Sequence, residues 1–79
     1  MQILTTRHFD RAFMKAPSDI KRAFLKQAEF LLSDLQHPSV RSKKYDKTRW
    51  QARVTRDWRL YFRIEGATYI MLDIMQHPK

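Results

Sequence analysis

The sequence predicts an α+β fold with elements in the order β-α-α-β-β-β-β, in which two N-terminal helices pack on one face of a single antiparallel-rich sheet. Apolar residues recur every three or four positions only in the N-terminal half, and from residue 40 onward they alternate with a period of two. The chain has 79 residues with one glycine and three prolines, which leaves it mostly regular structure. We therefore expect residues 1–79 to form one small domain.

The N-terminal half predicts a short strand over residues 2–5, followed by two helices. Thr6 is placed to cap the first helix, which ends at Pro17 because the residue before a proline avoids the helical conformation. Ser18 is predicted to cap the second helix, which runs to about Gln36. The apolar stripe of that helix consists of Ile20, Ala23, Phe24, Ala28, Leu31 and Leu35.

The C-terminal half predicts four strands, over residues 40–45, 49–55, 57–64 and 68–75. A turn is expected near residues 46–48, and a three-residue loop at 65–67 contains the only glycine, where a positive φ is expected. That loop sets residue 62 opposite 70, 60 opposite 72 and 58 opposite 74, so that every facing pair is apolar. The same register places Asp73 beside Arg59.

The hairpin from Arg49 to Arg63, folded about Arg56, separates into two faces. Its apolar face contains Trp50, Ala52, Val54, Trp58, Leu60 and Phe62, and its other face contains Arg49, Gln51, Arg53, Arg59, Tyr61 and Arg63. Like charges that face each other destabilise a strand pair, and this fold sets Arg53 opposite Arg59. The basic face is therefore interpreted either as a polyanion-binding surface or as a solvated surface over an ordinary core.

The net charge of +8 is concentrated in the second half of the chain. Residues 1–40 hold six basic and four acidic groups, and residues 41–79 hold ten and four. Because the basic residues lie mainly on predicted strands and not on an amphipathic helix, nucleic acid or an acidic polypeptide is favoured over a membrane as the partner.

Composition excludes several other classes of protein. The absence of cysteine excludes disulfides and thiolate metal sites, and neither His8 nor His37 has partners at metal-binding spacing. We expect no metal and no small-molecule cofactor. No apolar run approaches the ~20 residues of a membrane span and no signal peptide is evident, so a cytoplasmic location is expected.

The stretch from Trp50 to His77 resembles the RelE/ParE toxin superfamily of bacterial toxin–antitoxin systems, in particular its RelE/YoeB-like branch. The residues that carry the resemblance are the strand Trp58-Arg59-Leu60-Tyr61-Phe62 and the interval of 18 residues between Arg59 and His77. The resemblance implies a toxin that cleaves mRNA on the ribosome without metal, by attack of a 2′-hydroxyl on the adjacent phosphate. It also implies a cognate acidic antitoxin.

The resemblance assigns catalytic roles to Arg59 and Arg53 as phosphate ligands and to His77 as general acid. RNA-binding roles fall to Arg41, Lys43, Lys44, Arg49, Tyr61 and Arg63, with Tyr61 or Tyr69 supplying a ring for stacking. The structural alternatives are an ion pair of Arg59 with Asp73, a solvated Arg53 and a solvated His77. His77 lies four residues beyond Asp73, roughly 13 Å along an extended chain, so it must curl back to reach Arg59.

Two departures from the family pattern leave other functions open. Val40 stands at the position comparable to the catalytic glutamate of YoeB-like members, and Pro78 stands where an aromatic residue commonly follows the histidine. The main alternative is a non-enzymatic protein, either a ParE-like inhibitor of DNA gyrase or an inactive relative that only binds an antitoxin. A general RNA- or DNA-binding module is the third possibility.

Overall fold

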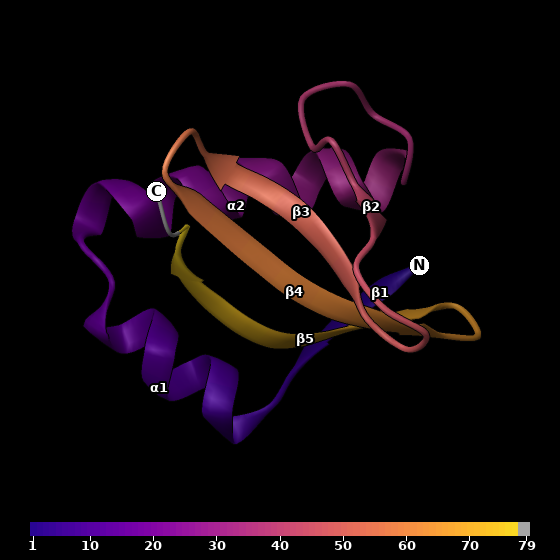
Figure 1. Cartoon of the computed structure of the whole chain (residues 1–79), viewed down its shortest axis with the longest axis horizontal. Coiled ribbons are helices and arrows are strands. Elements are labelled where there is room, and N and C mark those ends of the chain that lie inside the picture. The colour runs from indigo at the N-terminus through magenta and orange to yellow at the C-terminus, as the bar shows by residue number, and fades with distance from the viewer. Residues whose placement is uncertain (78–79) are drawn as a thin grey trace.

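A computed structural model of the chain describes residues 1–77 and shows two helices and a five-stranded sheet (Figure 1). The elements are β1 (Gln2–Thr5), α1 (Arg7–Lys15), α2 (Ser18–Ser33), β2 (Lys43–Lys44), β3 (Trp50–Thr55), β4 (Trp58–Glu65) and β5 (Thr68–Gln76). The strand order is β1-β5-β4-β3-β2, in which β1 pairs in parallel with β5 and all other pairs are antiparallel. The predicted fold class and element order are confirmed.

Both helices cover the same face of the sheet. Figure 1 shows α2 behind β3 and α1 alongside β5. The rings of Phe9 in α1 and Phe24 in α2 lie 5.2 Å apart, and both belong to the core cluster that includes Leu60 and Phe62 of β4. The apolar face of the hairpin is therefore the core face, and the basic face is left uncovered by the helices. No helix in residues 1–77 has the length and apolar character needed to cross a membrane.

The helix ends differ in part from the predicted ones. Thr6 caps α1 as expected, since its Oγ1 accepts a hydrogen bond from Phe9 N at 3.1 Å. Ser18 is instead the first residue of α2, whose N-cap is Pro17. The second helix ends at Ser33 and not near Gln36, because Asp34 adopts an extended backbone and its Oδ1 accepts from Gln36 N, a local turn that competes with the helix.

The strand predicted over residues 40–45 is reduced to β2, the two residues Lys43 and Lys44. Arg41 interrupts it with a φ of 50°, a left-handed conformation that a regular strand does not contain. Val40 is fully buried and its carbonyl accepts a hydrogen bond from Arg53 N at 2.7 Å. The segment before β2 is thereby attached to β3 without forming a regular ladder.

The register predicted for the hairpin of β3 and β4 is confirmed for residues 50–53 against 59–62, but a fold about Arg56 is wrong at the turn, where Thr55 and not residue 54 faces Trp58. Arg53 faces Arg59, Gln51 faces Tyr61 and the core residues Trp50 and Phe62 face each other. The connection is a two-residue turn at residues 56 and 57, and the strand register shifts at Val54, which is the extra residue of a bulge.

The register predicted between β4 and β5 is wrong. Glu65 pairs with Thr68, so the turn consists of two residues, and Gly66 occupies its first position with a φ of 57°, as type II′ hairpin turns prefer. Residue 62 consequently faces Met71 and not residue 70. A register shift then makes Leu72 an extra residue, so that 60 faces 74 and 58 faces 76. The core residues of β5 are Tyr69, Met71 and Ile74.

Candidate functional site

Four cationic side chains line one pocket on the uncovered face of the sheet. The pocket has a volume of about 220 Å³ and is lined by Arg41, Lys43, Gln51, Arg53 and Arg59, which we call the cationic pocket. These residues come from β2, β3, β4 and the segment before β2. The lining contains no carboxylate, so the pocket concentrates positive charge and favours a bound anion.

Arg59 is held in place by the hairpin turn beside it. Its Nη1 donates hydrogen bonds to the carbonyl oxygens of Thr55 at 2.8 Å and of Arg56 and Trp58 at 3.0 Å. These contacts replace the ion pair with Asp73 that the sequence left open. Arg59 therefore supports the turn as well as lining the pocket, and its position is fixed before any ligand binds.

Arg53 faces Arg59 across the strand pair and has an unsatisfied donor. Its Nε is buried and has no hydrogen-bond partner within residues 1–77. A buried donor without a partner costs free energy. Because this nitrogen has no accessible surface, a ligand oxygen can bond to it only if the Arg53 side chain moves. The Arg53 side chain is half-buried and lines the pocket, and a guanidinium suits the oxygens of a phosphate.

His77 lies closer to Arg59 than the sequence indicated. Because of the corrected register, Arg59 faces Met75 and not Asp73. The ladder continues past Gln76, since His77 N donates to the carbonyl of Asp57. His77 is thus two residues beyond the partner of Arg59, a diagonal position with a typical backbone separation of about 7–8 Å. The expected curling back of the tail is unnecessary. Pro78 lies outside the described residues.

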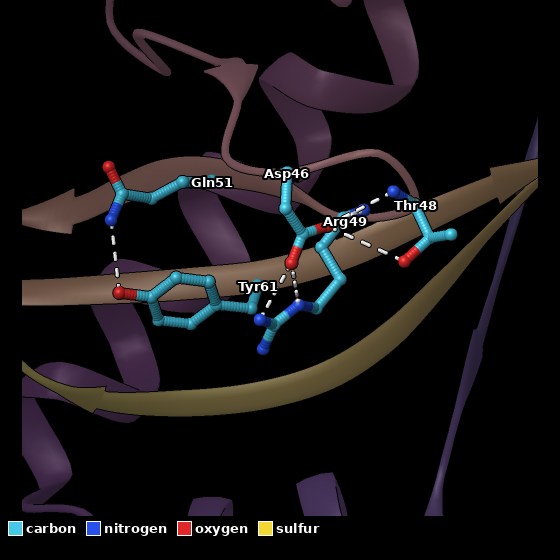
Figure 2. Close-up of polar contacts among 5 residues, drawn as sticks. All are labelled: Asp46, Thr48, Arg49, Gln51 and Tyr61. Carbon is cyan, nitrogen blue, oxygen red and sulfur yellow. Dashed lines mark hydrogen bonds and ion pairs between the residues drawn. The ribbon is translucent and has the colours of Figure 1, made fainter.

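Arg49 is fixed by a loop carboxylate beside the pocket (Figure 2). Its Nη2 and Nε lie 2.7 and 2.8 Å from Oδ2 of Asp46. Asp46 Oδ1 also accepts from the backbone nitrogens of Thr48 and Arg49. The side-chain bond from Arg49, supported by these backbone donors, lowers the pKa of Asp46 from 3.8 to about 2. Arg49 therefore carries a compensated charge.

The remaining predicted RNA-binding residues do not line the cationic pocket. Lys44 is exposed and its Nζ lies 5.7 Å from the ring of Trp50, its strand partner, so it is on the other side of β2 from Lys43. Arg63 pairs with Glu65, with Nε 3.2 Å from Oε1. The structure thus brings together Arg41, Lys43, Arg53 and Arg59 and separates Lys44, Arg49 and Arg63 from them.

The aromatic residues differ from expectation. Tyr61 is on the predicted face but is buried, and its hydroxyl accepts a hydrogen bond from Gln51 Nε2 at 3.0 Å (Figure 2). Tyr69, the other ring that the sequence offered for stacking on the basic face, is instead a core residue and packs against Phe62, so that prediction is wrong. The exposed ring belongs to Tyr45, which sequence reasoning missed. Its alternation with Lys43 along the predicted strand was the available signal.

The histidines in the helical half have structural contacts. His8 Nε2 lies 3.1 Å from Asp73 Oδ2, and His37 stacks on Phe30 with ring centroids 4.2 Å apart. Within residues 1–77, no group of three or more histidine, cysteine, aspartate or glutamate side chains is arranged to hold a metal ion.

The fold is shared with known bacterial and archaeal toxins. A YoeB/ParE toxin from Agrobacterium tumefaciens matches with a TM-score of 0.82 and 10% identity, over 99% of this chain and 100% of that one. The toxin–antitoxin complex RelBE2 from Mycobacterium tuberculosis matches with a TM-score of 0.76 and 23% identity, over 98% and 96%. The RelB–RelE antitoxin–toxin complex from Methanococcus jannaschii matches with a TM-score of 0.75 and 14% identity, over 92% and 88%.

No protein-family model matches the chain, and no curated protein has a significant sequence match. At these identities the structural matches establish the fold, which is that of RelE/ParE-type toxins. The fold implied by the sequence resemblance is therefore confirmed.

Proposed function

We propose that this protein is the toxin of a type II toxin–antitoxin system and that it inhibits translation in the cytoplasm as a ribosome-dependent, metal-independent mRNA endoribonuclease. The observation that carries the proposal is the cationic pocket, in which four side chains from separate segments converge without a carboxylate. A phosphodiester is the anion that such a pocket suits, because arginine forks match phosphate oxygens. The shared fold with RelE and YoeB/ParE toxins supports the same assignment.

The proposed reaction begins when the 2′-hydroxyl of one nucleotide loses its proton to solvent water, since the pocket lining has no carboxylate to accept it, and the 2′-oxygen attacks the adjacent phosphorus. A bond from the 2′-oxygen to phosphorus forms, the bond to the 5′-oxygen of the next nucleotide breaks, and a cyclic phosphate and a free 5′-hydroxyl result. Negative charge develops on the non-bridging oxygens in the pentacoordinate state. Arg59, already fixed by the turn, and Arg53, which lines the pocket opposite it, would stabilise that charge.

His77 would protonate the leaving 5′-oxygen. Its diagonal position relative to Arg59 is the basis for the assignment, because acid and phosphate ligand must act on the same phosphodiester. Histidine suits this step because its ordinary pKa lies close to neutral pH.

The lack of a carboxylate favours one second candidate. Val40, at the position comparable to the catalytic glutamate, is fully buried and apolar. The pocket lining offers no other carboxylate that could act as the base. A chain with this fold and this pocket that binds its target without cleaving it is therefore the alternative, either as a gyrase inhibitor or as an inactive antitoxin-binding relative.

The two candidates are separated by mapping RNA 5′ ends after brief expression. We expect new ends at fixed codon positions for the wild type and a loss of at least tenfold in Arg53→Gln and His77→Gln. Arg53 is preferred to Arg59 for this test, because Arg59 also supports the turn. The matched control is Arg63→Gln, which removes a strand arginine outside the pocket. Growth arrest with an SOS response and no new ends would refute cleavage and favour gyrase.

We also propose a cognate antitoxin that is acidic and partly disordered and that folds onto this chain over its basic half. The structural matches include toxins crystallised with their antitoxins. Binding to an acidic protein encoded beside this one should weaken as salt is raised, because salt screens exposed charges. An affinity that is the same at low and high salt would exclude the electrostatic part of this proposal.

A further inference from the structure

A second, smaller hollow lies on the same face as the cationic pocket and has a different chemistry. Its volume is about 100 Å³, and we call it the aromatic hollow. It is lined by Tyr45, Arg49, Tyr61, Leu72, Asp73 and Met75. Whereas the cationic pocket is lined by cations and no carboxylate, this hollow is lined by two aromatic rings, two apolar side chains, one arginine and one aspartate. Such a surface suits a flat, uncharged ring and not a phosphate.

Tyr45 is the accessible ring of the hollow and is held from two sides. Its exposed fraction is 52%, against 7% for Tyr61. The two rings meet edge to face with centroids 5.1 Å apart, and the Arg49 guanidinium lies 5.1 Å from the centre of the Tyr45 ring. Arg49 is itself fixed by Asp46 (Figure 2). A ring ordered before binding loses little entropy when a ligand stacks on it.

The hollow and the cationic pocket are directly connected. Gln51, which lines the cationic pocket, donates its side-chain hydrogen bond to the hydroxyl of Tyr61, which lines the hollow. Arg59 and Tyr61 stand two residues apart on the same face of β4, about 7 Å along the strand. One ligand that carries both an anion and an aromatic ring therefore reaches both sites.

Asp73 determines which part of such a ligand enters the hollow. Its Oδ2 contacts His8 and its Oδ1 accepts from Ile74 N at 2.8 Å, and the side chain remains 21% exposed. The carboxylate repels a phosphate, whereas its remaining lone pairs accept hydrogen bonds from the amino group of a base. The phosphate is thus directed to the cationic pocket and the base to the hollow.

We propose that the aromatic hollow is a stacking site for one base of a single-stranded RNA whose phosphate occupies the cationic pocket, with Tyr45 as the stacking residue. The inference rests on the proposed function for its ligand, RNA. It extends that function by assigning base recognition to the loop before β3. Stacking on an aromatic ring and on an arginine plane is the common way in which proteins hold unpaired bases.

The test compares two uncleavable probes, a 2′-O-methyl adenosine hexamer and an abasic hexamer with the same backbone, by fluorescence anisotropy. Wild-type protein should bind the adenosine hexamer about tenfold more tightly, the usual contribution of one stacked base. Tyr45→Ala should lower that ratio to near one, and Tyr45→Phe should keep it. The matched control Arg41→Gln should weaken binding of both probes by the same factor, because it removes only a phosphate contact.

Two further measurements keep the outcomes separable. Tyr45→Leu retains apolar packing on Tyr61 without an aromatic face, so it should behave like Tyr45→Ala even if the alanine variant is less stable. An unchanged ratio in Tyr45→Leu, or a wild type that binds both probes equally, would overturn the proposal. The probes cannot be cleaved, so this binding test does not depend on catalysis. If the Tyr45 variants lose the preference for the adenosine hexamer but the wild type produces no new RNA 5′ ends on expression, the endoribonuclease is refuted and the stacking site is retained.

Discussion

Gln27 connects the core to the cationic pocket, and its replacement provides a sharp test of the structure. Its side chain is 9% exposed on α2 and donates from Nε2 to the carbonyl oxygens of Ser39 at 2.7 Å and Arg53 at 2.8 Å. These bonds join the helix to the segment before β2 and to the bulged part of β3. Gln27→Met keeps the length of the side chain and removes both donors.

The expected loss of unfolding free energy follows from the two carbonyl groups that lose a donor. A buried acceptor left without its partner costs about 1–3 kcal/mol. Ser39 is exposed, so water can partly replace the bond to its carbonyl, and the full penalty falls mainly on Arg53. We therefore expect a loss of about 2–4 kcal/mol, which lowers the melting temperature of a domain of this size by roughly 10–30 °C.

Urea unfolding followed by the fluorescence of Trp50 and Trp58 measures this loss. The m value should be unchanged, which shows that the variant has the same unfolded and native surfaces. Gln36→Met is the matched control, because Gln36 is exposed and should change stability by less than about 0.5 kcal/mol. If Gln27→Met were as stable as this control, the two hydrogen bonds would not contribute as the geometry indicates.

Two more predictions concern the core and the loop beside the pocket. Phe62 is fully buried against Trp50, Tyr69 and Met71, so Phe62→Ala should cost about 3–5 kcal/mol in urea unfolding, and a loss below about 1 kcal/mol would contradict its central position. The folded pKa of Asp46, about 2, is below its ordinary value of 3.8, so the pair with Arg49 stabilises the fold above about pH 4 and is lost as the pH falls through 2. A carboxyl-carbon NMR titration should show this low pKa in the wild type and a higher pKa in Arg49→Gln, still below the ordinary value because the backbone donors of residues 48 and 49 remain.

The dual role of Arg59 has a consequence for mutagenesis of this face. Three backbone carbonyls of the turn accept hydrogen bonds from one nitrogen of Arg59, so Arg59→Ala removes a structural support together with a phosphate ligand. Loss of activity in that variant would not by itself show catalysis. Arg53, whose Nε has no partner in the described chain, gives the cleaner measurement.

The hairpin of β3 and β4 was predictable because its two faces differ in chemistry. Only one alternation buries Trp50, Leu60 and Phe62 while leaving Arg53 and Arg59 on the open face, so the pairing of residues 50–53 with 59–62 follows from the sequence alone. The bulge beside the turn does not. The first strand, the Thr6 cap and the end of α1 before Pro17 were predictable for a similar reason, since each depends on a local signal.

The register of β5 was not predictable in this way, because both of its alternations are largely apolar. Ile70 and Leu72 appeared as suitable for the core as Tyr69 and Met71. The two-residue turn at Gly66 and the extra residue at Leu72 decided between them. A shift of one residue exchanges the faces of a strand, which is why the error also displaced Asp73 and His77 relative to Arg59.

The sequence by itself determined the fold class, the order of the two helices and five strands along the chain, and the concentration of positive charge on one strand pair. It could do so because periodicity and charge are local properties. Tertiary structure alone decided which cations share a pocket. Arg41 reaches it because its left-handed backbone and the bonds of Gln27 fold the preceding segment onto β3. Lys44 is excluded because neighbouring residues of a strand point to opposite faces, and only the pairing of β2 with β3 determines which face belongs to Lys43.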